Sequence, residues 1–185
     1  SNLGGSVIVS DGANLYADNV VTTGGATIAG NLTLGNSGST TTGANFYVDP
    51  SSDDALLVSG SLTLNGTNTV VLTGPITSSS IKVMAYAGAL TGSASNLTLQ
   101  GGLGAYRPGT GFSTSGNQVN LNVVLGDVVW TGENGNNWDT ATVNWNDGTV
   151  DTAFFNLDSV TFDDSAALVN VTIPTGVTVT PGAIL

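Results

Sequence analysis

The chain has 185 residues, of which 40% are hydrophobic and only 8% are charged, and its formal net charge is −11. It contains no cysteine and no histidine, which excludes disulfides, thiol chemistry and the commonest general base and metal ligand. Lys82 and Arg107 are too few to bind nucleic-acid phosphates, and no apolar run is long enough to insert into a membrane as a helix.

Short runs of β-branched residues and leucine, each ended by glycine or asparagine, predict strands along the whole chain. Signals for helices are nearly absent. The predicted strands cover residues 7–9, 32–34, 56–58, 62–64, 70–72, 97–99, 119–125, 128–130, 160–162, 169–173 and 177–179.

One tripeptide, leucine-threonine-leucine, recurs among these strands. It stands in residues 31–35, 61–66 and 96–101, whose first residues lie 30 and 35 positions apart. A solenoid explains such spacing, because stacked coils place equivalent strands in register. We therefore predict an all-β chain that forms a β-solenoid, specifically a right-handed parallel β-helix. The alternative is an antiparallel β-sandwich, favoured most for residues 126–185, where short turns separate successive strands.

Three tryptophans interrupt this pattern in a segment rich in glycine and asparagine. Trp130, Trp138 and Trp145 lie in the sequence W-T-G-E-N-G-N-N-W-D-T-A-T-V-N-W, which fits neither a regular helix nor a plain strand. The chain is thus expected to divide into coils over residues 1–125, a tryptophan-rich junction over 126–157 and further coils over 158–185. The three rings either form a platform for carbohydrates or fill a small core under the loop, and the second reading is favoured.

Other candidate sites are weaker. Glu133, Asp139 and Asp147 lie in an asparagine-rich segment and could contribute oxygen ligands to Ca²⁺, although no known calcium-loop pattern is present. A polysaccharide lyase would need a base beside acidic residues, and neither Lys82 nor Arg107 has an acidic neighbour close in the chain. A hydrolase needs only paired carboxylates, and that alternative stays open. With no histidine or cysteine, the sequence favours a protein with no catalytic role and no cofactor.

Two stretches resemble a known family. Residues 62–69, L-T-L-N-G-T-N-T, are similar to the autotransporter-associated β-strand repeat of large bacterial surface proteins. Residues 128–148 resemble the opening of a block in such proteins, and residues 81–124 resemble the end of one. The resemblance implies an exported β-helix with a structural or adhesive role at the cell surface. Because a block end precedes a block start, it also implies that the chain is cut from a repeating unit.

The two ends of the chain suggest self-association. Both are uncharged and strand-like, and neither resembles a cap, so copies are expected to join head to tail as tandem units or as filament subunits. The residues expected to take part are Ser1, Leu3, Val7, Ile8, Val9, Val177, Val179, Ile184 and Leu185.

Overall fold

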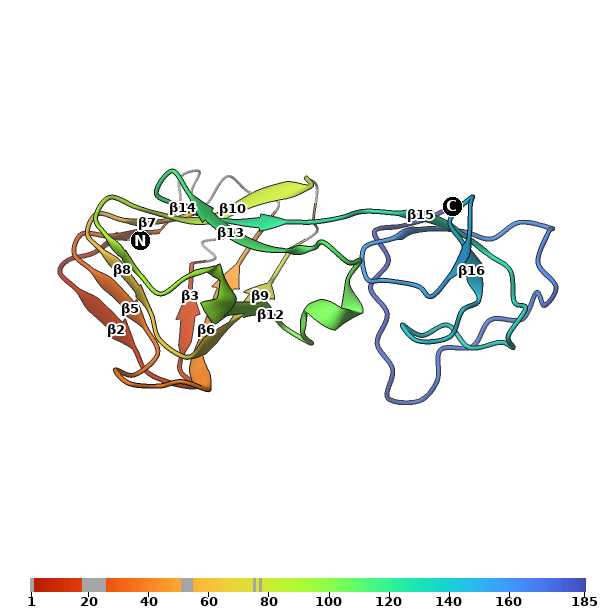
Figure 1. The fold of residues 1–185 in the computed structure, drawn as a ribbon, viewed down its shortest axis with the longest axis horizontal. Coiled ribbons are helices and arrows are strands. Elements are labelled where there is room, and N and C mark those ends of the chain that lie inside the picture. Colours follow the sequence, from red (N-terminus) through yellow and green to blue (C-terminus); the bar gives the residue numbers. More distant parts are fainter. Residues whose placement is uncertain (1, 18–25, 51–54, 75, 77) are drawn as a thin grey trace. The chain divides into compact units, whose positions relative to one another are not determined.

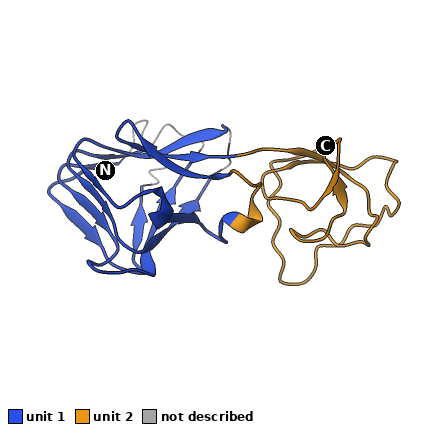
Figure 2. Ribbon diagram, in the orientation of Figure 1, with its two compact units in different colours: residues 1–103, 110–123 blue, residues 104–109, 124–185 orange. Residues whose placement is uncertain are grey.

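The computed structural model describes residues 2–17, 26–50, 55–74, 76 and 78–185. The chain forms two compact units (Figure 2): unit 1 contains Ser1–Leu103 and Thr110–Val123, and unit 2 contains Gly104–Gly109 and Val124–Leu185. The segments predicted as a junction (126–157) and as further coils (158–185) thus belong to one unit. Both units are built from strands, and the described residues add only two 3₁₀ helices, η1 (Ala94–Asn96) and η2 (Leu103–Ala105).

Unit 1 is a solenoid whose coils each supply one strand to three parallel sheets, and strands of equivalent position lie side by side in Figure 1. Sheet A contains β1 (Asn2–Leu3), β4 (Thr27–Ile28), β7 (Leu56–Val58) and β10 (Ser80–Tyr86). Sheet B contains β2 (Val7–Val9), β5 (Leu32–Leu34), β8 (Leu62–Leu64) and β11 (Leu90–Thr91). Sheet C contains β3 (Asn14–Tyr16), β6 (Thr42–Val48), β9 (Thr67–Leu72) and β12 (Leu97–Leu99).

The prediction of a β-solenoid is confirmed, since stacked parallel strands make about six turns. Among the described residues of unit 1, four coils each contribute one strand to sheets A, B and C. Alternation of inward leucine and outward threonine builds the stack: in β5 and β8 both leucines are buried and the threonine between them is partly exposed.

Only two of the three leucine-threonine-leucine tripeptides stack on each other. Leu32, Thr33 and Leu34 pair in register with Leu62, Thr63 and Leu64. The third tripeptide, in β12, lies in sheet C and pairs with β9, while β11 takes the next place in sheet B. The third tripeptide follows the second by 35 residues rather than 30, so it lies beyond the corner of the coil, in the next sheet.

Glycines form one corner of the coils because backbone from the preceding coil leaves no room for a side chain. The N–H of Gly30 donates to the carbonyl of Gly5 at 3.0 Å, and the N–H of Gly60 donates to that of Gly30 at 2.9 Å. A β-carbon on Gly30 would lie 2.6 Å from the backbone of Gly5. Gly30 and Gly60 therefore require glycine because of the close approach of backbone, whereas Gly5 has a φ of 95° in the left-handed region.

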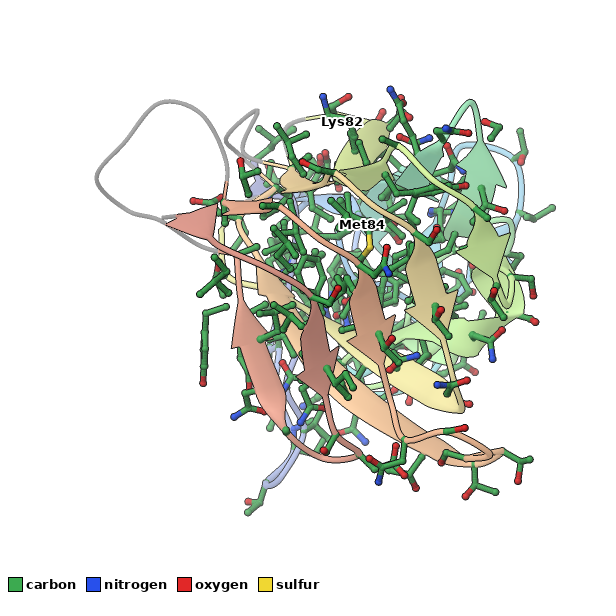
Figure 3. The ribbon with its side chains drawn as sticks, turned by 90° about the vertical axis from the view of Figure 1, so that its left-hand side faces the viewer. Lys82 and Met84 are labelled. Carbon is green, nitrogen blue, oxygen red and sulfur yellow. The ribbon has the colours of Figure 1, made fainter. Side chains whose placement is uncertain are left out.

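An antiparallel hairpin covers one edge of sheet A. It consists of β13 (Gly111–Ser115) and β14 (Gln118–Asn122), and β14 pairs antiparallel with β10. A register shift between Lys82 and Met84 lets the Lys82 side chain stay exposed while the Met84 side chain points into the core (Figure 3).

Unit 2 contains a five-stranded mixed sheet in the order β17-β16-β15-β18-β19. Its strands are β15 (Asp127–Trp130), β16 (Trp145–Asn146), β17 (Asp151–Thr152), β18 (Ser159–Thr161) and β19 (Ala183–Ile184). The alternative prediction of an antiparallel sandwich for 126–185 is wrong, because β15, β18 and β19 pair in parallel. The strands predicted at 169–173 and 177–179 do not form either: Thr172 makes only an isolated bridge to Asn137.

Candidate functional site

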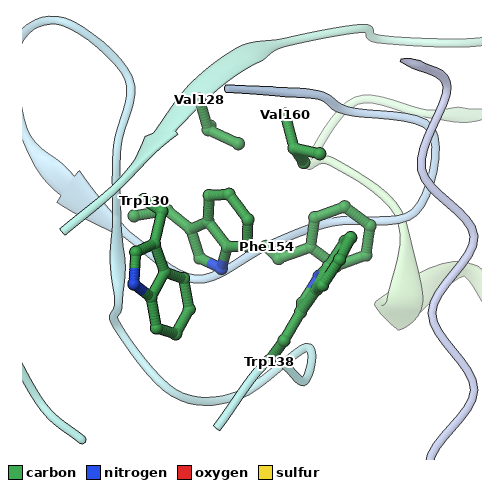
Figure 4. Packing of buried hydrophobic residues seen from close by; sticks show 6 residues of the cluster. Val128, Trp130, Trp138, Phe154 and Val160 are labelled. Carbon is green, nitrogen blue, oxygen red and sulfur yellow. The ribbon is translucent and has the colours of Figure 1, made fainter. Parts of the chain in front are cut away.

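The tryptophan segment forms the core of unit 2. Trp130 and Trp145 are paired residues of β15 and β16, and their rings meet edge to face with centroids 5.1 Å apart. Trp138 lies 5.3 Å from Trp145 and 5.4 Å from Phe154, both also edge to face. Figure 4 shows these rings packed together, with Val128 and Val160 in the same cluster.

Because all three indole rings are buried, none presents an open face on which a sugar could stack. Trp138 is 6% exposed, and Trp130 and Trp145 are exposed less than that. The three rings thus lie in the loop-core arrangement. Trp130 donates from Nε1 to the carbonyl of Leu168 at 2.7 Å, whereas the indole nitrogens of Trp138 and Trp145 are buried without a partner.

A buried asparagine shapes the loop between Trp130 and Trp145. The side chain of Asn144 donates to the carbonyls of Gly135 and Asn137, each at 3.0 Å, and accepts from the N–H of Asn134 at 2.7 Å. These side-chain bonds satisfy backbone groups of the loop that have no partner strand for regular hydrogen bonding. The glycines and asparagines of the motif therefore fold the loop around its rings.

An ion pair joins the two chain segments of unit 2. Arg107 donates from Nε to Oδ1 of Asp158 at 2.6 Å and from Nη2 to Oδ2 at 3.1 Å. The guanidinium lies 5.5 Å from the ring of Phe155, and a β-carbon at Gly126 would lie 2.0 Å from Nε. Burial raises the pKa of Asp158, and hydrogen bonds from Arg107 and the backbone of Phe155 oppose that rise. The pair therefore positions residues 104–109 rather than adding much net stability.

The acidic residues proposed as calcium ligands do not gather. Asp139 accepts from the backbone and hydroxyl of Thr142, and Asp147 accepts from Thr149 and Val150, so each closes its own turn. Glu133 is exposed. Within the described residues, no three acidic, histidine or cysteine side chains form a cluster that could hold a metal ion.

The residues predicted to mediate self-association differ in their placement. Leu3, Ile8, Ile184 and Leu185 are exposed, whereas Val9 is buried. Val7, Val177 and Val179 are half-buried; Val177 and Val179 lie outside the strands, and Val179 packs on the tryptophan cluster. Ser1 lies outside the described residues.

As far as the described residues show, the first coil has one open edge in each sheet. Within the described residues, β1, β2 and β3 each pair on one side only, with β4, β5 and β6. In unit 2, β19 likewise pairs only with β18.

Comparison with known proteins gave no match to a family model, a curated protein or a solved structure. Within the described part of the chain, no helix has the length and apolar character needed to cross a membrane.

Two structural elements of unit 2 had no clear signal in the sequence. Arg107 and Asp158 are 51 residues apart, and nothing near either residue indicates the other. Asn144 carries a weak signal, because it directly precedes a tryptophan in a segment where asparagine recurs.

We expect acid to weaken the contribution of three turn aspartates, Asp139, Asp147 and Asp163, to the stability of unit 2. Hydrogen bonds from Val150 and Thr149 lower the pKa of Asp147 to about 2, and a hydrogen bond from the Ser165 side chain lowers the pKa of Asp163. For Asp139, burial raises the pKa but the bonds from Thr142 and Ala141 outweigh it. A lowered pKa contributes stability above the unfolded value of 3.8, and this contribution disappears as the pH falls toward 2.

We expect Asp147→Ala to lower the melting temperature of unit 2 at pH 6 and to differ less from the unsubstituted chain near pH 2. Tryptophan fluorescence reports the transition, because all three tryptophans lie in unit 2. Glu133→Ala is the control, since it removes an exposed charge without removing a turn. Equal destabilisation by Asp147→Ala at both pH values would contradict the assignment.

Proposed function

We propose that the chain is a structural, non-enzymatic segment of an extracellular or cell-surface filament, fibre or adhesin, extended by head-to-tail pairing of solenoid coils. The observation that supports this most directly is the open edge of the first coil. A strand edge exposes unpaired N–H and C=O groups and is a template for another strand unless something covers it.

The contrast within sheet A supports the proposal. At one end of the sheet the β13–β14 hairpin covers β10, whereas at the other end the described residues leave β1 uncovered. On β2, the edge strand of sheet B, Ile8 is 72% exposed, and in unit 2 Leu185, next to β19, is 74% exposed. Apolar side chains beside open edges favour pairing with another coil, either a tandem unit of one polypeptide or a second subunit.

The chemistry of the chain favours a scaffold over an enzyme. It has no histidine or cysteine, and Asp158 is held by Arg107. Low charge and a surface of threonine, serine and asparagine are typical of exported bacterial proteins, which agrees with the resemblance to autotransporter-associated repeats. The net charge of −11 would keep finished fibres apart laterally.

The test is a proline at the edge of β2. The Val7 N–H donates to the carbonyl of Asn31, and the carbonyl of Val9 accepts from the N–H of Gly35, so the backbone of Ile8 faces the open edge. Ile8→Pro therefore removes the donor offered to another coil without breaking a bond within the chain. We expect the unsubstituted chain to form concentration-dependent oligomers in analytical ultracentrifugation and Ile8→Pro to remain monomeric.

Ile8→Thr is the matched control, because it keeps the N–H and places threonine in the column of Thr33 and Thr63. It should still associate. Circular dichroism checks that both variants retain the fold. A chain that stays monomeric at high concentration, or Ile8→Pro oligomers equal to those of Ile8→Thr, would contradict the proposal.

A further inference from the structure

Two tyrosines and two asparagines form a ladder on the outer face of sheet C. Tyr16 of β3 pairs in register with Tyr47 of the adjacent strand β6, and Asn14 pairs with Asn45 (Figure 1). The tyrosine rings stack with centroids 4.3 Å apart and planes inclined by 24°. The side chain of Asn45 donates to Oδ1 of Asn14 at 2.9 Å, so the amides form a second rung beside the rings.

Tyr16 is the end of the stack. Tyr47 covers one face of its ring, yet 59% of Tyr16 remains exposed, so the other face of the ring is open. The side-chain nitrogen of Asn14 lies 3.4 Å from the Tyr16 hydroxyl, at the long end of a hydrogen bond. An open aromatic face thus lies beside a side-chain amide that can form further hydrogen bonds.

We propose that this ladder, Tyr16 with Asn14 at its open end, binds a neutral saccharide. A pyranose has an apolar face of C–H groups that suits an aromatic ring and hydroxyls that suit an amide. The four strands of sheet C contain no charged residue, and the column of Asn14 and Asn45 continues through Thr69 and Thr98. The flanking Asp11 and Asp49 disfavour an anionic ligand.

This site is independent of the tryptophan cluster and does not need the proposed head-to-tail pairing. The two activities exclude each other at one place, because β3 is an edge strand and the open face of Tyr16 lies on the side where another coil would pair. A saccharide bound there would therefore occupy only an unpaired first coil.

The experiment uses isothermal titration calorimetry of the full chain carrying Ile8→Pro, so that self-pairing does not hide the site. The probes are cellohexaose, xylohexaose, chitohexaose and maltohexaose, with hexagalacturonate as the anionic comparison. We expect at least one neutral hexaose to bind. Tyr16→Ala should weaken that binding about tenfold, whereas Tyr16→Phe, which keeps the ring, should change it by less than about threefold.

Asn14→Ala tests the amide and should also weaken binding, while Thr63→Ala on the outer face of sheet B should leave it unchanged. Thermal unfolding checks that each variant is folded. The proposal is overturned if no neutral hexaose binds, if Tyr16→Ala binds as tightly as Tyr16→Phe, or if only hexagalacturonate binds. None of these outcomes affects the proposed edge pairing, which ultracentrifugation measures separately.

Discussion

Replacing Asn68 with alanine is expected to lower the free energy of unfolding of unit 1 by about 3 kcal/mol, because three backbone groups would lose their partner. Asn68 is fully buried in β9. Its Oδ1 accepts from the N–H of Ala44 at 2.7 Å, and its Nδ2 donates to the carbonyls of Asn65 and Asn96, each at 3.2 Å.

These three partners belong to three successive coils, so one amide ties together coils that the ladder alone joins in pairs. Ala44 lies in the coil of β6, Asn65 in the coil of Asn68 itself, and Asn96 in the coil of β12. A buried amide with all its partners is stabilising, whereas its removal leaves polar backbone in an apolar interior. The cost should therefore exceed that of a typical surface substitution several-fold.

Chemical denaturation followed by far-ultraviolet circular dichroism measures the effect. Asn45→Ala is the matched control, because Asn45 stands on the outer face of the neighbouring strand β6 and bonds mainly to Asn14. It should cost less than about 1 kcal/mol. A loss below that value for Asn68→Ala would show that water or local rearrangement satisfies the three groups.

Periodicity predicted the solenoid because the spacing of inward leucines follows directly from the stacking of coils. The leucine-threonine-leucine tripeptides of β5 and β8 lie in the register that their 30-residue interval implies. The same reasoning fails for β12, because leucine-threonine-leucine fits an inward-outward-inward strand in any sheet, and here β11 takes the place after β8 while β12 pairs with β9. The strands predicted at 169–173 and 177–179 fail for another reason: β-branched residues favour strands only where another strand is available for pairing.

Long-range polar contacts could not be predicted in the same way. Asn68 looks like any other asparagine in a threonine-rich chain, and its role depends on facing the interior near the start of β9. The Arg107–Asp158 pair depends on the return of residues 104–109 to unit 2, which no local pattern specifies. By contrast, large rings in a small unit have few places other than its core, and the prediction of a loop core for the tryptophans followed from that.

Trp145→Ala is expected to destabilise unit 2 by about 3–5 kcal/mol, the range for deleting a buried aromatic ring. Trp145 lies at the centre of the cluster, with ring contacts to Trp130, Trp138, Phe154 and Phe162. The core of unit 2 consists of only six buried residues, so the cavity left by one indole has few neighbours that can fill it.

Phenylalanine substitutions separate packing from hydrogen bonding in the same cluster. Trp145→Phe removes an indole nitrogen that has no partner, whereas Trp130→Phe removes the donor that holds the carbonyl of Leu168. Trp130→Phe should therefore cost about 1 kcal/mol more than Trp145→Phe. Fluorescence of the remaining tryptophans follows unfolding in each variant. Equal losses of stability in the two phenylalanine variants would mean that the hydrogen bond to Leu168 contributes nothing. A small loss of stability in Trp145→Ala would mean that the cluster is not the core that stabilises unit 2.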